Sequence, residues 1–496
     1  MNYRNKWLSC ICSAAMMVAL LTTSCAEGID DDERFNAGVS NTQLEAPTLN
    51  ESSFSVQVNA DGSENVVVTW PVVYGAGGYL VNVTCNNPND PYVVKDQKVD
   101  GCRFLFPREV DTKYVVSVST LGNEKLNNTG SPEPATFEYS TVVPGITIPS
   151  GMEISQFIAA NLPASSTDEI AFELIGGETY ILNDKADLHI ANVTIRGDRY
   201  NRAYVVVQNQ GGFINQNGVN LRYINFDMSD APLTSLITMS GDPDPRFSTE
   251  ALGLKALSEE VKNGYIVQNP VSIESCNLRN VPSSLIASGQ IGDGGSAGWG
   301  YKVIRINDCI VQFNKANSKP AISLEDNWGF AGIEMMVLSN STFYNLADYK
   351  CRFLRYGVRM RPGQAFGPGA TTNHTLKNCT FYKTFTGDQF ANNMDNSGLV
   401  ADINHCIFYD IMRVDQYCFR NGTSTTAKPE DNVSWLGGAD GSLHGNMLKM
   451  STEIDPDFAG PTTAMFDLNE PKGGVNFRPQ SSFCLTNGIG DPRWLE

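Results

Sequence analysis

A six-residue pattern of apolar and polar positions recurs seven times in the latter two thirds of the chain. In each copy, apolar or small residues occupy the first, fourth and sixth positions. The copies are residues 190–195, 221–226, 273–278, 306–311, 338–343, 376–381 and 403–408, and their first residues lie 27 to 52 positions apart. A sequence unit that returns at such intervals is typical of a protein built from stacked repeats.

The spacing inside each copy predicts a strand, a corner and a second strand. The step from position four to position six is the period of two expected of a strand, whereas the step from one to four contains an extra residue. The corner residue is Asn192, Asp308, Asn340 or Asn378 in four copies. Asn and Asp tolerate the left-handed conformation that a sharp corner requires. We therefore predict an all-β protein whose residues 145–496 form a right-handed parallel β-helix.

The fourth position of four copies is a cysteine. These residues are Cys276, Cys309, Cys379 and Cys406, and Ser341 and Val193 replace them elsewhere. In a β-helix they would stack inward as a ladder, one per coil and about 4.8 Å apart. A linear ladder does not suit tetrahedral metal binding, so we expect these thiols to pack as small apolar side chains.

Two further segments have interpretable patterns within the β-helix region. Residues 156–162 precede an opening coil at 168–181 and are expected to form a short helix over the open apolar end. Residues 242–264 place leucines and a valine at helical spacing, which predicts an inserted loop with a helix. An insertion of this kind is held in place by the rigid coil.

Residues 46–140 form a different module. Their apolar residues alternate at period two between Gly and Pro turns, which predicts a small β-sandwich. With Trp70, Tyr79 and Tyr114 the module resembles a fibronectin type III domain, and the resemblance implies that these rings are core. Cys85 and Cys102 could pair in an oxidising compartment, which the sequence leaves open.

The N-terminal segment has the pattern of a secretion signal. Arg4 and Lys6 precede the apolar stretch 8–21, and small residues lead to Cys25. Residues 1–25 resemble a bacterial lipoprotein signal, which implies lipid attachment at Cys25, and a plain secretory signal is the alternative. Residues 26–45 form an acidic tether that resembles the surface-export tag of Bacteroidota lipoproteins. We therefore expect a lipid-anchored protein of the outer membrane, exposed at the cell surface.

The overall charge limits the classes of molecule that the protein can bind. The 496-residue chain has 36 Lys and Arg against 54 Asp and Glu, and its net charge is -18. Such a chain offers no basic stripe for a phosphate backbone, so nucleic acid is excluded as a partner. No ordered set of His, Cys or carboxylate ligands is present, so neither a cofactor nor a metal is predicted.

Three short motifs carry a resemblance to a known family. They are residues 378–381 (Asn-Cys-Thr-Phe), residues 455–458 (Asp-Pro-Asp-Phe) and residues 488–494, which end in Asp-Pro-Arg-Trp. The chain resembles the pectate-lyase-like β-helix lipoproteins of polysaccharide-utilisation loci in gut Bacteroidota. The resemblance implies a polysaccharide ligand and outer-membrane glycan-uptake proteins as partners. Many such proteins have no established activity, so the function of a member depends on the side chains of its own site.

A cluster of cations is the first candidate site. Twelve residues contain five cations and no carboxylate, namely Lys350, Arg352, Arg355, Arg359 and Arg361. Strand alternation points the arginines outward, where their guanidinium groups can bind uronate carboxylates in two-point fashion. The alternative is a set of structural ion pairs. The acidic partners would then be Asp348, Asp388, Asp410 and Asp415 on neighbouring turns.

Tryptophans in glycine-rich segments form the second candidate binding site. Trp299 and Trp328 are expected in loops, where an exposed indole could stack on a sugar ring. The alternative is that they cover the end of the hydrophobic core. Trp435 carries a weaker signal of the same kind.

Catalysis would need further groups. A lyase requires a base, for which Lys350 or Arg352 is the candidate, and calcium or a cation to neutralise the uronate. Calcium could be held by Asp326, Asp348 and Asp388, whereas a hydrolase would need a carboxylate pair from Asp388, Asp402 and Asp410. The four histidines show no ligand spacing, and His405 occupies a corner position.

The sequence therefore predicts a surface lipoprotein that binds an acidic, pectin-like or other uronate-containing polysaccharide for uptake and degradation. The first alternative is a polysaccharide lyase that acts by β-elimination in the same place. The second is a non-catalytic structural or adhesive surface protein, which fully paired arginines would favour.

Overall fold

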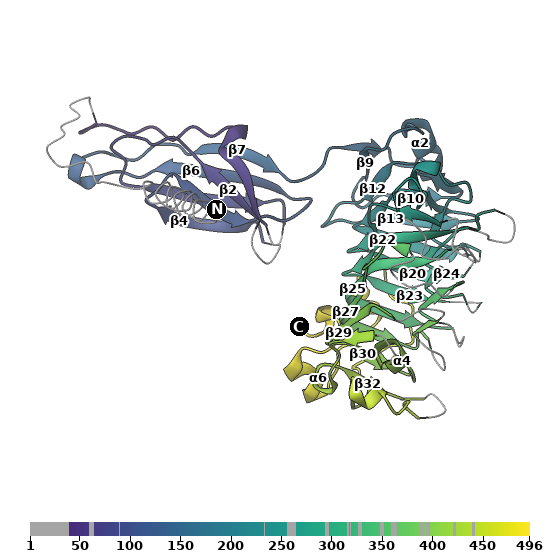
Figure 1. Ribbon diagram of the computed structural model, residues 1–496. Coiled ribbons are helices and arrows are strands. Elements are labelled where there is room, and N and C mark those ends of the chain that lie inside the picture. The colour runs from purple at the N-terminus through teal and green to yellow at the C-terminus, as the bar shows by residue number, and fades with distance from the viewer. Residues whose placement is uncertain are drawn as a thin grey trace, which may run out of the picture. The chain divides into compact units, whose positions relative to one another are not determined.

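The computed structural model describes most of the chain and divides it into two compact units between Val142 and Val143 (Figure 1). The described residues are 39–58, 64–88, 90–232, 234–254, 264–292, 297–314, 317, 319–325, 330–347, 352–358, 365–385, 390–392, 397–419, 423–438 and 442–496. In these ranges, no helix combines the length and the apolar character needed to cross a bilayer.

The first unit is an antiparallel β-sandwich. One sheet has the order β1-β2-β5 and the other the order β4-β3-β6-β7. The strands are β1 (Phe54–Val58), β2 (Glu64–Thr69), β3 (Tyr79–Cys85), β4 (Tyr92–Val99), β5 (Arg103–Pro107), β6 (Lys113–Thr120) and β7 (Ala135–Ser140). Trp70, Tyr79 and Tyr114 are buried between the sheets. The prediction that these rings are core is confirmed.

Cys85 and Cys102 are both free thiols in the sandwich. The Cys102 Sγ lies 3.6 Å from the Tyr79 hydroxyl, and the Cys85 Sγ lies 3.7 Å from the Asp90 carbonyl oxygen. The disulfide that the sequence left open is therefore absent from the structure.

The second unit is a parallel β-helix with three faces, here called A, B and C. Face A consists of β8 (Gly145–Ile148), β9 (Glu169–Leu174), β12 (Asn192–Arg196), β15 (Val219–Arg222), β19 (Val271–Glu274), β22 (Gly298–Asn307), β25 (Gly332–Asn345), β27 (Thr372–Tyr382), β29 (Leu399–Asn404) and β31 (Thr423–Thr425). Face B consists of β10 (Thr179–Leu182), β13 (Ala203–Gln208), β16 (Ile224–Asp230), β20 (Asn277–Val281), β23 (Ile310–Phe313), the later parts of β25 and β27, β30 (Ile407–Tyr409), β32 (Val433–Trp435) and β33 (Thr452–Glu453).

Face C is a separate seven-stranded parallel sheet. Its strands are β11 (Lys185–Asp187), β14 (Gly212–Asn215), β17 (Ile237–Met239), β21 (Ile286–Ala287), β24 (Ile322–Leu324), β26 (Leu354–Tyr356) and β28 (Ala391–Asn392). The chain runs from A to B, then to C, and back to A one coil further on. The core lies inside the coil, where the rings of Phe343, Phe381 and Phe408 stack with centroids 5.1 and 5.5 Å apart. The predicted β-helix is confirmed.

The corner between faces A and B is left-handed in six of the seven repeat copies. Its residues have φ between 48° and 56° and are Tyr223, Ser275, Asp308, Asn340, Asn378 and His405. The prediction of a corner at Asn192 in the first copy, residues 190–195, is wrong. Ile195 pairs with Leu221, so residues 192–196 form one straight strand and the corner of that coil is Gly197. Glycine is required there because a Cβ would lie 2.3 Å from the Tyr223 carbonyl oxygen.

The cysteine ladder is present and faces inward. Cys276, Cys309, Cys379 and Cys406 are buried and free. The Cys276 Sγ lies 3.3 Å from the Glu274 carbonyl oxygen, and the Ser341 hydroxyl makes the equivalent bond to the Ser339 carbonyl at 2.6 Å. Burial raises the pKa of Cys276 to about 12, which keeps it a thiol. The expectation that these residues pack as small apolar groups is confirmed.

Helix α2 (Ile154–Asn161) covers the first coil with the buried side chains of Ile154 and Ile158, as predicted. In the expected insertion, residues 255–263 lie outside the described residues. Leu252 and Leu254 precede them and pack against Phe330 and Phe366.

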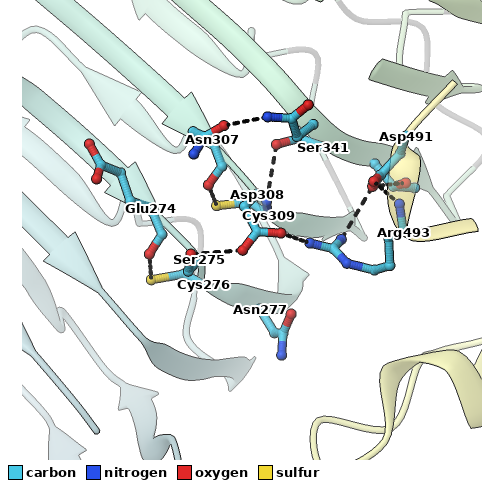
Figure 2. A network of polar contacts seen from close by, with 12 residues as sticks. Glu274, Ser275, Cys276, Asn277, Asn307, Asp308, Cys309, Ser341, Asp491 and Arg493 are labelled. Carbon is cyan, nitrogen blue, oxygen red and sulfur yellow. Dashed lines mark hydrogen bonds and ion pairs between the residues drawn. The ribbon is translucent and has the colours of Figure 1, made fainter. Parts of the chain in front are cut away.

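The C-terminal segment, which includes α5 (Pro471–Gly474) and α6 (Ser482–Asn487), covers the outer surface of face B. Figure 2 shows its last contacts, in which Arg493 reaches the corner residue Asp308 and the neighbouring Asp491. Asp491 accepts a hydrogen bond of 2.8 Å from the Thr342 hydroxyl, and Trp494 donates to the same hydroxyl at 2.8 Å.

Candidate functional site

Two of the five predicted cations lie in the described part of the structure. Arg352 is on the connection from face B to face C, and Arg355 is on strand β26. Lys350, Arg359, Arg361, Trp328 and the lipidation candidate Cys25 lie outside the described residues.

Trp299 is not an exposed loop residue, and its assignment as a sugar-binding platform is wrong. It lies within β22, which pairs there with β18 (Gly264–Val267), and its side chain is fully buried. The indole nitrogen donates a 2.8 Å hydrogen bond to the Ser240 carbonyl. The neighbouring glycines are strand positions. Gly300 makes room for a ring, because a Cβ there would lie 2.9 Å from the ring of Phe330.

Arg355 points outward from face C between the buried Leu354 and Tyr356. Its guanidinium forms an ion pair with Glu325 on the preceding coil. Lys319 lies 3.5 Å from the other oxygen of the same carboxylate. Two cations therefore share one carboxylate. The ion-pair alternative is correct for Arg355, although the partner is Glu325 and not one of the predicted aspartates.

The other described aspartates of the prediction serve different roles. Asp410 is buried after β30 and accepts hydrogen bonds from the backbone of Gly437 at 2.7 Å and Gly438 at 3.0 Å. Asp402 lies on β29 of face A. Because they belong to different faces of the coil, Asp402 and Asp410 do not form the carboxylate pair that a hydrolase needs. Asp326, Asp348 and Asp388 lie outside the described residues.

Arg413 extends the row of cations along the edge of face C. Backbone bonds connect Ala321 to Arg352, Leu354 to Phe390, and Phe390 to Arg413. Arg352 and Arg413 are therefore two coils apart, roughly 10 Å along the axis. Arg413 is half-buried, and among the described residues no carboxylate lies within ion-pair distance of it. We call Lys319, Arg352, Arg355 and Arg413 the basic flank.

A histidine and an aspartate lie next to Arg413. The helix α4 (Asp415–Phe419) follows Arg413, and the His444 backbone nitrogen donates to the Met412 carbonyl at 3.2 Å. The His444 Nδ1 lies 2.5 Å from the Asp415 Oδ2. Asp415 is fully buried, whereas the His444 side chain is 41% exposed. We call this pair the dyad.

Burial of the dyad costs free energy of folding. The second Asp415 oxygen, Oδ1, is buried and has no hydrogen-bond partner among the described residues. A buried polar atom without a partner costs about 1–3 kcal/mol. Sequence reasoning missed this pair because its members lie 29 positions apart and match no short motif.

The other two described histidines near the core have structural roles. His374 is buried inside the coil, where it contacts the Tyr417 hydroxyl, and burial lowers its pKa to about 4. It is therefore neutral near pH 7. His405 has φ 56° at a corner, which confirms its prediction as a turn residue.

The described part of the flank does not fit a calcium ion. Both oxygens of Glu325 are already in ion pairs, with Arg355 and with Lys319. In the described ranges, no group of three or more His, Cys, Asp or Glu side chains could hold a metal ion.

Comparisons with known proteins add little about the site. One family profile, described as a domain of unknown function (DUF4992), matches residues 3–177. No curated protein matches the chain. A PL6 alginate lyase in complex with a trisaccharide is 10% identical with a TM-score of 0.16, over 65% of this chain and 91% of that one. Pectate lyase Pel3 from Pectobacterium carotovorum is 10% identical with a TM-score of 0.13, over 79% of this chain and 86% of that one. Similarity at this level carries no argument about activity, and the fold assignment stands on the strand pairings themselves.

Proposed function

We propose that the protein binds an acidic, uronate-containing polysaccharide along the basic flank. Arg413 carries the proposal, because it is a cation with no described carboxylate partner in a chain of net charge -18. Lys319 and Arg355 lie on the same flank, where both contact Glu325. A polyanion is the partner that a row of cations attracts.

The β-helix suits this ligand because it holds the cations at fixed intervals. Successive coils place side chains at a repeat of about 4.8 Å along one edge of face C. Arginine binds a carboxylate through two parallel hydrogen bonds, so a row of arginines can bind successive acidic sugars. A rigid row loses little conformational freedom on binding.

The remaining parts of the chain support a surface location within this proposal. Lipid on Cys25 would anchor the protein to the outer membrane, and residues 26–45 would serve as a tether. The β-sandwich, with antiparallel sheets of three and four strands, suits a fibronectin type III-like spacer. Outer-membrane glycan-uptake proteins would then receive the bound polysaccharide for import and degradation.

Affinity electrophoresis tests the binding. The protein should migrate more slowly in a gel containing polygalacturonate than in one containing a neutral glucan, and added salt should weaken the retardation. Arg355→Gln and Arg413→Gln should each weaken binding about tenfold, the loss of one charged hydrogen bond. Arg305→Gln is the matched control, because Arg305 is similarly exposed and pairs with Glu274 on face A. Equal migration in both gels would overturn the proposal.

A purely structural or adhesive protein is the second candidate function. The Arg355–Glu325 ion pair favours it, because a paired arginine can simply tie one coil to the next. The two candidates differ in the behaviour of the wild type. If polygalacturonate retards neither the wild type nor the Arg413→Gln variant, the structural function is favoured.

A further inference from the structure

The cysteine ladder consists of two pairs of neighbouring thiols. The strand register places Cys276 and Cys309 at the same position of adjacent coils. It does the same for Cys379 and Cys406. Ser341 occupies that position on the coil between the two pairs. Because adjacent coils are about 4.8 Å apart, the members of a pair are one such step apart, and the cysteines on either side of the serine are two steps apart.

Disulfide geometry permits a bond within a pair and excludes one across the serine. The two Cα atoms of a disulfide are about 4.4–6.8 Å apart. One coil step falls inside this range, whereas two steps, about 10 Å, exceed it. In the second pair the thiols also interact directly, because burial, and then a hydrogen bond with the Cys406 thiol, raise the pKa of Cys379. The second pair therefore has both the register and the contact that a bond requires.

We propose that Cys379 and Cys406 are joined by a disulfide when the chain folds in an oxidising compartment. Both are free thiols in the structure, which represents the reduced form of the pair. The bond would connect β27 to the corner between β29 and β30, one coil further on. The secretion signal proposed for residues 1–25 would deliver the chain to such a compartment. The bond does not depend on glycan binding by the basic flank.

The oxidant is a second disulfide, such as oxidised glutathione. The thiolate of one cysteine attacks one sulfur of that disulfide, breaks its S–S bond and forms a mixed disulfide. The thiolate of the other cysteine then attacks the protein sulfur of the mixed disulfide, which forms the Cys379–Cys406 bond and releases the second glutathione. The two cysteines together lose two protons and two electrons, and the oxidant gains them as it becomes two thiols.

Burial limits this reaction to the folding chain. The Cys379 and Cys406 side chains are both fully buried in the folded protein. The reactive species is the thiolate, and a thiol in apolar surroundings ionises poorly. The pair must therefore be oxidised before β29 and β30 stack on β27. For this reason the test follows refolding of the chain.

The test refolds the full-length, reduced protein from urea in a mixture of oxidised and reduced glutathione. The remaining thiols are then blocked with N-ethylmaleimide, and the protein is digested without reductant and mapped by mass spectrometry. Two peptides linked through Cys379 and Cys406 should appear, lighter by two hydrogen atoms than the sum of the free peptides. Dithiothreitol should separate them.

Cys406→Ser is the matched variant. Serine should be tolerated there, because Ser341 is buried at the same position of an earlier coil. In this variant Cys379 should be recovered blocked by N-ethylmaleimide. If Cys379 and Cys406 are both blocked in the refolded wild type, the proposal is overturned. A bond from Cys406 to Cys418, the buried free thiol of α4, overturns it as well.

Stability gives a second measurement of the same bond. In the unfolded chain the bond closes the segment between the two cysteines into a loop, which lowers the conformational entropy of that chain. The urea midpoint of the β-helix transition should therefore be higher for the oxidised wild type than for the wild type in dithiothreitol. Cys406→Ser should show no such difference. Equal responses of the two proteins to dithiothreitol overturn the assignment of the bond.

Discussion

Arg493 forms an ion pair with Asp308, which lies 185 positions earlier in the chain and forms the corner between β22 and β23 (Figure 2). The same guanidinium lies 3.2 Å from Asp491, whose side chain is 1% exposed. The contact fastens the C-terminal segment over face B. It gives the terminal Asp-Pro-Arg-Trp motif a structural role.

Replacing Arg493 with Met should therefore destabilise the β-helix. The substitution leaves the buried Asp491 without its cation, and breaking a buried pair in this way costs about 3–5 kcal/mol. The measurement is the midpoint of the β-helix unfolding transition in urea. Lys472→Met is the control, because Lys472 and Glu496 are both exposed, and it should change stability by less than about 1 kcal/mol. Equal midpoints for the two variants would contradict the role of Arg493.

The corner residue Asn378 gives a second prediction. Its φ of 54° disfavours β-branched side chains, so Asn378→Val should cost about 2 kcal/mol in unfolding free energy. Asn378→Gly relieves the backbone but removes the 3.0 Å bond to Asn340, and it should stay within about 1 kcal/mol of wild type. Thermal unfolding of both variants measures the difference. A valine variant as stable as the glycine variant would show that the corner is not strained.

The fold could be predicted from the sequence because its signals are local. The left-handed corner and the inward fourth position lie within six residues, so each copy contains its own evidence. The exception is residues 190–195, which have the same apolar spacing. Their last residue, Ile195, aligns with Leu221, the first residue of the next copy. Only the register between coils reveals that error.

The candidate site was less predictable because its contacts are not local. The glycines around Trp299 indicate a loop, yet they lie in a strand, and Gly300 makes room for Phe330 on the next coil. The sequence offers aspartates as partners of Arg355, but the stacking of coils places Glu325 beside it. His444 lies beside Asp415 only because the segment after β32 passes next to the start of α4. Contacts set by stacking cannot be read from spacing alone.

Lipid attachment at Cys25 is a third prediction, and it concerns a residue outside the described ranges. Cys25→Ser should abolish incorporation of radiolabelled palmitate and move the protein from the membrane fraction to the soluble fraction. Cys102→Ser is the control, because Cys102 is a free thiol in the sandwich and should not affect labelling. If the Cys25 variant remains labelled and in the membrane fraction, another residue or segment anchors the protein.

The buried His374 gives a prediction about pH. Burial lowers its pKa from 6.5 to about 4, so the unfolded chain binds a proton that the folded protein does not accept. The stability that this residue contributes is present above pH 6.5 and is lost as the pH falls toward 4. Between pH 7.5 and pH 5 the loss should be about 2 kcal/mol.

The His374→Gln variant isolates this effect, because glutamine cannot take up the proton. Its unfolding free energy should fall less than that of wild type over the same pH range, by about 2 kcal/mol. His189→Gln is the matched control, since it makes the same substitution at a histidine whose side chain is 33% exposed. Because acidic residues titrate in all three proteins, only the difference between variants reports on His374. Identical slopes for the wild type and His374→Gln would mean that the imidazole accepts its proton within the fold.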